Sequence, residues 1–225
     1  MNHLHTEIKK LKSELIDMAA LIRHQIEKSC TALLKYDKNL AREVVFNEKR
    51  ANAYELKIDK DCENIFALYN PVANDLRFVL STLKSNANLE RMGDNAVGIA
   101  HFVIELEYEF DKKLIEELQI QNMTNICLEM VDNIISAYEH DDTESARLLF
   151  EKDAELNALN KAGMEILSAT ILTNPTEIDR LLRLLILIRK LERTGDLIKS
   201  MAEEIIFYVE AKVIRHGNNT MKGIS

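Results

Sequence analysis

Leu89-Glu90-Arg91-Met92-Gly93-Asp94 returns nearly half a chain later as Leu191-Glu192-Arg193-Thr194-Gly195-Asp196. A motif used twice at this separation indicates that one structural unit has been duplicated. The Glu and Asp of each copy are four residues apart, so on a helix both carboxylates leave the same face, one turn apart. We therefore expect two related helical units, each presenting a pair of oxygen ligands.

The composition favours a few long helices and a sizeable core. The 225 residues include 6 Gly, 2 Pro and no Trp, which leaves few turn signals, and 47% of them are hydrophobic. The net charge of −8 argues against general nucleic-acid binding, which needs a basic face. No apolar run approaches the ~18 residues of a membrane span, and the charged N-terminus is unlike a signal peptide. Three widely spaced cysteines without a CxxC pattern are typical of reduced thiols, so we expect a soluble cytoplasmic protein.

Apolar residues spaced three and four apart predict an all-α fold of six helices. Both prolines follow an asparagine, and this pattern predicts helix starts at Pro71 and Pro175, capped by Asn70 and Asn174. Glu177 would then be the third residue of the helix, the position of the acid in a capping box. The predicted helices cover residues 8–35, 38–69, 71–108, 114–139, 143–172 and 175–215.

The charged segment 109–113 interrupts the periodicity and predicts the boundary between the two units. We expect a first three-helix unit over residues 1–109 and a second over residues 110–215. Residues 216–225 are rich in Gly and Asn without periodicity, which is typical of a frayed tail.

Acidic and amide residues interrupt helix stripes that otherwise look like core. On the third predicted helix the stripe runs from Leu76 and Leu80 to Glu90 and Asp94, and the fifth has a similar stripe around Asp153. A buried carboxylate is costly unless it is paired or binds a metal. A positive group should therefore face these acids.

Residues equally distant from a tight turn lie level on the two antiparallel helices that it joins. By this rule an acid and an asparagine one turn apart face the Glu-x-x-x-Asp pair in each half. Oxygen donors without Cys or His suit Mg, Mn or Fe better than a structural zinc. The predicted metal ligands are Glu48, Asn52, Glu90 and Asp94 in the first half, and Asp153, Asn157, Glu192 and Asp196 in the second.

Salt bridges are the main alternative to metal binding, and they differ between the halves. Arg189 and Lys199 flank the acids of the second half, whereas Ala87 and Val97 take the equivalent positions in the first. The first site should therefore need a cation more than the second. Glu55, in a further acid pair, is expected to face no other acid.

Two other functional interpretations remain open from the residues. The first is a metal-dependent enzyme of the carboxylate-bundle type, although no phosphate loop, HExxH or nucleophile elbow is present. The second is a metal-free helical interaction module whose acids form salt bridges only. The six histidines are scattered, and we expect them on the surface.

The motifs resemble the PhoU family of bacterial phosphate-uptake regulators over nearly the whole chain. Pro71 to Arg77 resembles the family's Pro-x-Ala-x-Asp-Leu-Arg, and Leu89 to Ala100 its Leu-Glu-Arg-x-Gly-Asp signature. The second half matches more loosely. It keeps Pro175, has Asp179-Arg180 near the Asp-Leu-Arg position, and carries the signature over Leu191 to Asp196.

The resemblance implies two three-helix bundles, a homodimer, and multinuclear metal clusters of Fe, Mn, Mg or Zn. It implies a non-enzymatic negative regulator of phosphate uptake and of the phosphate-starvation response. Its expected partners are the ATPase subunit of the phosphate ABC transporter and a sensor histidine kinase, with membrane contact only through them and none with nucleic acid. The matched acids are Glu90, Asp94, Glu192 and Asp196, faced by Glu48 and Asp153, while Asn52 and Asn157 stand where the family often has Asp.

Overall fold

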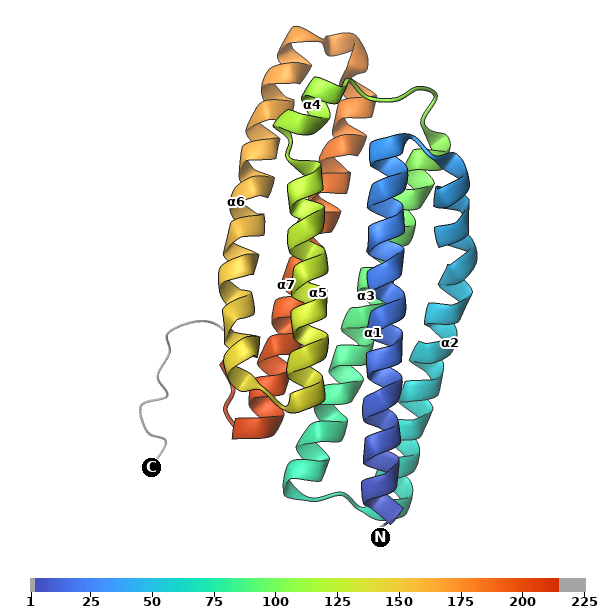
Figure 1. Cartoon of the computed structure of the whole chain (residues 1–225), viewed down its shortest axis with the longest axis vertical. Coiled ribbons are helices and arrows are strands. Elements are labelled where there is room, and N and C mark those ends of the chain that lie inside the picture. Colours follow the sequence, from blue (N-terminus) through green and yellow to red (C-terminus); the bar gives the residue numbers. More distant parts are fainter. Residues whose placement is uncertain (1–2, 215–225) are drawn as a thin grey trace.

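The computed structural model describes residues 3–214, which lie in helices joined by short turns, without strands (Figure 1). This confirms the predicted all-α class. The expected frayed tail, residues 216–225, lies outside the described residues. The elements are α1 (His3–Lys35), α2 (Lys38–Tyr69), α3 (Ala73–Glu105), α4 (Lys112–Glu117), α5 (Ile120–His140), α6 (Thr143–Thr173), the 3-10 helix η1 (Pro175–Glu177) and α7 (Ile178–Glu210).

The long helices form two three-helix bundles that stand side by side, as the repeated motif predicts. Helices α1, α2 and α3 pack together in one bundle, and α5, α6 and α7 in the other (Figure 1). The bundles meet where α3 packs against α7 and α1 packs against α5. None of the helices in the described part is long and apolar enough to cross a membrane.

The two units begin their second helices with the same cap. The Asp37 carboxylate accepts hydrogen bonds from the backbone N–H groups at the start of α2, at 2.9 and 3.0 Å. Asp142 accepts the equivalent bonds at the start of α6, at 3.0 and 3.1 Å. An acid at this position satisfies N–H groups that have no partner within the helix. Both starts agree with the predicted residues 38 and 143.

The predicted asparagine caps at the two Asn-Pro pairs are wrong. Asn70 ends α2 in the left-handed region, with φ 44°, and α3 begins two residues after Pro71. Asn174 precedes η1, but its side chain accepts no capping hydrogen bond, and α7 begins only at Ile178. The Glu177 carboxylate accepts a hydrogen bond from Tyr108 instead of forming a capping box.

The predicted helix over residues 114–139 is interrupted. Gln119 has φ 51°, in the left-handed region, and it separates the short α4 from α5. Leu118 and Ile120, on either side of it, are both buried. The change of direction allows two neighbouring apolar side chains to enter the core together.

The predicted core stripe on α3 is also wrong in part. Leu76 and Leu80 are 37% and 38% exposed, and Asp94 is exposed, while Phe78 and Val79 are buried. The reason is that α3 contacts α7 of the other bundle as well as α1 and α2. Because α3 is also covered by the second bundle, its buried face differs from the apolar stripe predicted from the sequence.

Candidate functional site

The structure brings the four predicted ligands of the second half together. Asp153 on α6 is 2% exposed, and its Oδ2 accepts hydrogen bonds from Lys199 Nζ at 2.7 Å and from Asn157 Nδ2 at 3.3 Å. Its Oδ1 is buried without a hydrogen-bond partner. Glu192 and Asp196, one turn apart on α7, face it. This group carries three carboxylates, one amide and one ammonium.

Burial and neighbouring negative charge together raise the pKa values of the carboxyl groups in this group. Burial, followed by the charge of Asp196, raises the pKa of Glu192 above its usual range. Burial, followed by the charge of Asp153, also raises the pKa of Asp196. The pKa of Lys199 is raised in turn by its hydrogen bond to Asp153. A further cation at this position would relieve the repulsion.

The first half gathers a different set of acids from the predicted one. Burial, followed by the charges of Asp94 and Glu55, raises the pKa of Glu90. The expectation that Glu55 faces no acid is therefore wrong. Within residues 3–214, the side chains of Glu48 and Asn52 form no hydrogen bond or ion pair, and Asn52 is exposed.

The helix register explains why Glu55 was missed. Asn86 Nδ2 on α3 donates hydrogen bonds to the backbone oxygen of Glu55 at 2.9 Å and to Asp59 Oδ1 at 2.8 Å. This contact sets α2 against α3 beside the acids of the first half. Glu55 lies about one helical turn after Asn52, so a slip of one turn would have identified it.

The two motif glycines allow close helix contacts beside the acids. A Cβ on Gly195 would lie 2.6 Å from Leu156 Cδ1 and 3.7 Å from Asp153 Oδ1. A Cβ on Gly93 would lie 2.9 Å from Ile22 Cδ1. Each glycine therefore permits a neighbouring helix to approach the motif more closely than any larger residue would.

The acidic group of the second half has the right ligand atoms for a hard cation, but they are not arranged around a common metal position. Carboxylate and amide oxygens suit Mg²⁺ or Mn²⁺, and Oδ1 of Asp153, which has no hydrogen-bond partner, is available as a metal ligand. However, the ammonium of Lys199 already neutralises that carboxylate. Across residues 3–214, no group of three or more His, Cys, Asp or Glu side chains is arranged to hold a metal ion.

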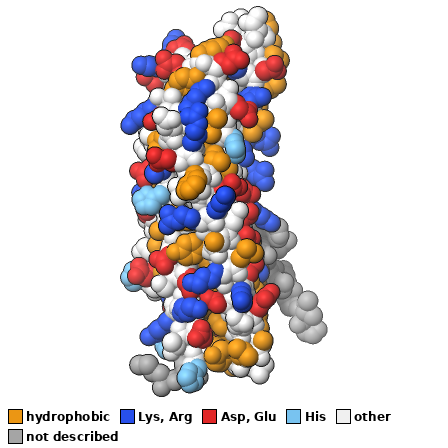
Figure 2. All heavy atoms as spheres, turned by 90° about the vertical axis from the view of Figure 1, so that its right-hand side faces the viewer, with side chains coloured by type: hydrophobic (Ala, Val, Ile, Leu, Met, Phe, Trp, Pro, Cys, Tyr) orange, Lys and Arg blue, Asp and Glu red, His pale blue; other side chains and the backbone are white. Residues whose placement is uncertain are grey.

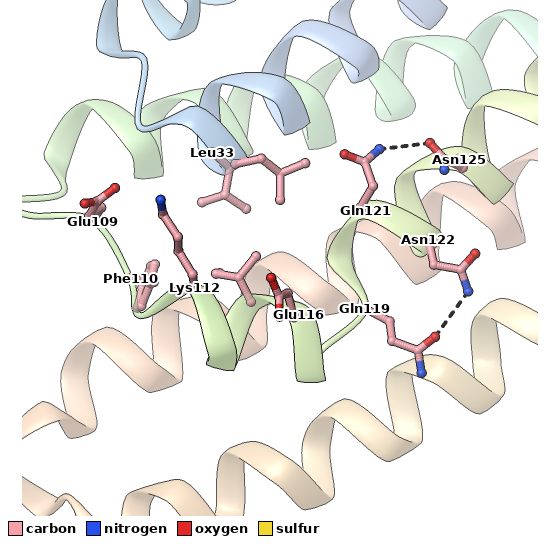
Figure 3. A pocket seen from close by; sticks show the side chains of 11 residues that line it. Leu33, Glu109, Phe110, Lys112, Glu116, Gln119, Gln121, Asn122 and Asn125 are labelled. Carbon is pink, nitrogen blue, oxygen red and sulfur yellow. Dashed lines mark hydrogen bonds between the residues drawn. The ribbon is translucent and has the colours of Figure 1, made fainter.

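A separate cavity of about 540 Å³ lies at one end of the molecule, away from the acids. It is enclosed by the end of α1, the segment before α4, α4 itself and the start of α5 (Figure 3). Lys112 reaches into it between Glu109 and Leu33 (Figure 3). The amides of Gln121 and Asn122 donate to neighbouring side chains at 2.9 and 3.3 Å. The sequence did not reveal this cavity, because α4 was not predicted as a separate helix.

The histidines and cysteines contribute nothing to the acidic groups. His3, His5, His24, His101 and His140 are exposed, as predicted, and His216 lies outside the described residues. The cysteines are free and buried: Cys30, Cys62 and Cys127.

Comparisons with known proteins point to one family. The model of the PhoU domain matches residues 15–103 and 120–205, one match in each bundle. A protein of Aquifex aeolicus named phosphate-specific transport system accessory protein PhoU homolog is 32% identical, covering 98% of this chain and 99% of that protein. One of the same name from Pseudomonas putida is 30% identical, over 94% of this chain and 82% of that protein. The crystal structure of PhoU from Pseudomonas aeruginosa superposes with a TM-score of 0.84 at 28% identity, covering 92% of this chain and 99% of that one.

Proposed function

This chain belongs to the PhoU family, and from that premise we propose that it is a negative regulator of phosphate uptake and of the phosphate-starvation response. It is an accessory protein of the phosphate-specific transport system and not an enzyme. The observation that carries the proposal is the match of both bundles to the PhoU domain. We assign the two functional units to residues 1–109 and 110–215.

The proposed regulation works through protein contacts in the cytoplasm. The partners are the ATPase subunit of the phosphate ABC transporter and the sensor histidine kinase, and the regulator acts as a homodimer that reaches the membrane only through them. Basic and acidic side chains alternate over the face that includes α2, with isolated apolar side chains among them (Figure 2). Phe46 and Leu56 on α2 are 76% and 70% exposed. Such a mixed surface suits a partner protein better than a nucleic acid.

Deletion of the gene in its host tests the regulatory role. We expect phosphate-starvation genes to be expressed even at high external phosphate, and an intact copy of the gene to restore repression. Purified protein should bind the purified ATPase subunit in size-exclusion chromatography. Normal repression in the deletion strain would refute the proposal.

We further propose that the acidic groups hold divalent cations such as Mn, Fe, Mg or Zn. The ligands would be Asp153, Asn157, Glu192 and Asp196 in the second half, and Glu48, Asn52, Glu90 and Asp94 in the first, with Glu55 as an additional acid. A bound cation would neutralise the carboxylates that now repel each other. Because Lys199 already pairs with Asp153, the first site should bind its metal more tightly.

Elemental analysis tests the metal sites. Wild-type protein purified without chelator or histidine tag should contain metal, and less of it after Glu90→Ala/Asp94→Ala. Tighter binding by the second site in a titration would reverse the assigned order of affinity.

The ion pair between Lys199 and Asp153 favours a second candidate, a metal-free interaction module. In that case the wild type would contain no metal, take up none on titration, and keep its stability in chelator. The regulatory role would stand in either case.

A further inference from the structure

A small basic pocket between α1 and α2 contains a buried amide without a hydrogen-bond partner. Its volume is about 280 Å³. None of the side chains that line it is acidic. Its polar lining consists of His24, Gln25, Lys28, Asn47 and Arg50.

Gln25 is the unusual member of this lining. Its side chain is 3% exposed, and neither Oε1 nor Nε2 has a hydrogen-bond partner. Its Oε1 would lie 3.4 Å from a Cβ on Gly93, which shows that the amide is enclosed by α3 as well. A buried amide without a partner in the protein is free to bind a ligand or water that enters the pocket.

The charges around the pocket indicate what that partner is. The Arg50 guanidinium forms no hydrogen bond or ion pair within residues 3–214. Lys28 contacts only the exposed carboxylate of Glu43, at 3.0 Å, and His24 lies 3.7 Å from Glu27. The pocket therefore offers N–H donors and positive charge, a combination that binds oxygen atoms carrying negative charge.

We propose that this pocket binds a small tetrahedral oxyanion, with inorganic phosphate as the ligand to test. The Gln25 amide donates from the buried end, and the Arg50 guanidinium binds the anion from α2. The volume of about 280 Å³ matches a small anion better than a ligand of nucleotide size. The site lies apart from the proposed metal ligands, and the inference holds independently of the proposed regulatory role.

Equilibrium dialysis of the full chain against inorganic phosphate tests the site. Measurements at neutral pH and low salt, with a chelator, exclude phosphate bound through a metal ion. We expect saturable binding of one phosphate per chain. Arg50→Ala and Gln25→Met should each weaken it about tenfold or more, because each removes a donor to a charged ligand.

Arg42→Ala is the matched control. Arg42 is also an exposed arginine on α2, but its side chain donates to Asn39 on its own helix and does not line the pocket. Its removal should change the affinity by about twofold or less, the effect of a distant surface charge. The melting temperature of Gln25→Met should equal or exceed that of the wild type, since the buried orphan amide is gone. Phosphate should raise the melting temperature of the wild type but not of this variant.

Competing anions identify the source of the oxyanion. Displacement of phosphate by sulfate supports a general oxyanion pocket, and displacement by O-phosphoserine would identify a phosphorylated side chain as the source. Absence of saturable binding by the wild type would overturn the proposal. Equal weakening by Arg42→Ala, or unchanged binding by Gln25→Met, would overturn it as well.

Discussion

At the scale of single residues, Asp153 determines the properties of the second acidic group. Its carboxylate is buried, one oxygen has no partner, and the other depends on Lys199 at 2.7 Å. A charge in such a place is tolerated only while an opposite charge remains beside it. Within this group, we therefore expect the replacement of Lys199 to lower the free energy of unfolding most.

Lys199→Met is expected to lower the free energy of unfolding of metal-free protein by roughly 1–3 kcal/mol, because it leaves the Asp153 carboxylate buried without its cation. A divalent cation that binds the acids should restore part of the loss. The measurement is urea unfolding in chelator and again with Mn²⁺. Lys152→Met is the control, since Lys152 pairs with the exposed Glu129 and should cost at most about 1 kcal/mol. Equal effects of the two substitutions would contradict this prediction.

Asp196→Asn tests the repulsion through its pH dependence. Because the pKa of Asp196 is raised in the folded state, its contribution to stability is full below the ordinary carboxyl pKa of about 4 and is lost as pH rises through the raised value. The variant carries no such group. In chelator it should therefore match the wild type at acid pH and exceed it at neutral pH, in unfolding free energies measured across that range. A variant less stable than the wild type at neutral pH would show that the carboxylate is net stabilising.

At the residue scale, the hairpin rule places the acids of the second half together as the structure has them, and places those of the first half only in part; the metal ligands stay a prediction. Asp153 lies with Glu192 and Asp196 as the hairpin rule predicts. The same rule selected Asn52, whereas Glu55 is the residue that faces Glu90. A rule based on distance from a turn assumes a tight turn, and the left-handed and extended residues between α2 and α3 alter the register.

At the scale of helices, the sequence predicts the ends well where the apolar periodicity stops at a short polar break. The starts of α2 and α6 agree with the predicted residues 38 and 143, and Asp37 and Asp142 cap them. The break at Gln119 was not predictable, because no glycine or proline marks it. The buried face of α3 also escaped prediction, because part of it is set by α7, which belongs to the other bundle.

Gly195→Ala should lower the free energy of unfolding by about 1–2 kcal/mol, although alanine is the better helix former. The added methyl group would lie 2.6 Å from Cδ1 of the fully buried Leu156, so this side chain or the packing of α6 on α7 has to shift. Gly98→Ala is the matched control in α3, where the methyl group would meet the flexible end of Lys190. That control should gain up to about 1 kcal/mol from helix propensity. Denaturant unfolding of both variants provides the comparison, and a stabilised Gly195→Ala would show that the helices are not tightly packed there.

At the scale of the whole molecule, the duplicated motif predicts two bundles but not how they are joined. Polar and aromatic side chains make the connection: Arg23 on α1 bonds to Asp132 on α5 at 2.5 and 2.9 Å, and Thr82 on α3 shares a 2.6 Å hydrogen bond with Tyr138 on α5. These residues lie on faces that a single bundle would leave exposed. Their partners come from the other half of the chain, so periodicity within one helix carries no information about them.

Phe78 tests whether the two bundles unfold as one unit. Its ring, on α3, lies 5.8 Å from that of Tyr138 and 5.4 Å from that of Tyr208, measured between centroids, and both tyrosines belong to the other bundle. Phe78→Ala should cost about 3–5 kcal/mol, since it empties a buried space shared by both units. Phe46→Ala, which removes an exposed ring from α2, should cost less than about 0.5 kcal/mol. Unfolding followed by far-UV circular dichroism and by tyrosine fluorescence should give one coincident transition for the wild type and both variants. Two separate transitions in the wild type would show that the bundles unfold independently. Equal costs for the two substitutions would show that the Phe78 ring contributes no stability at the contact between the bundles.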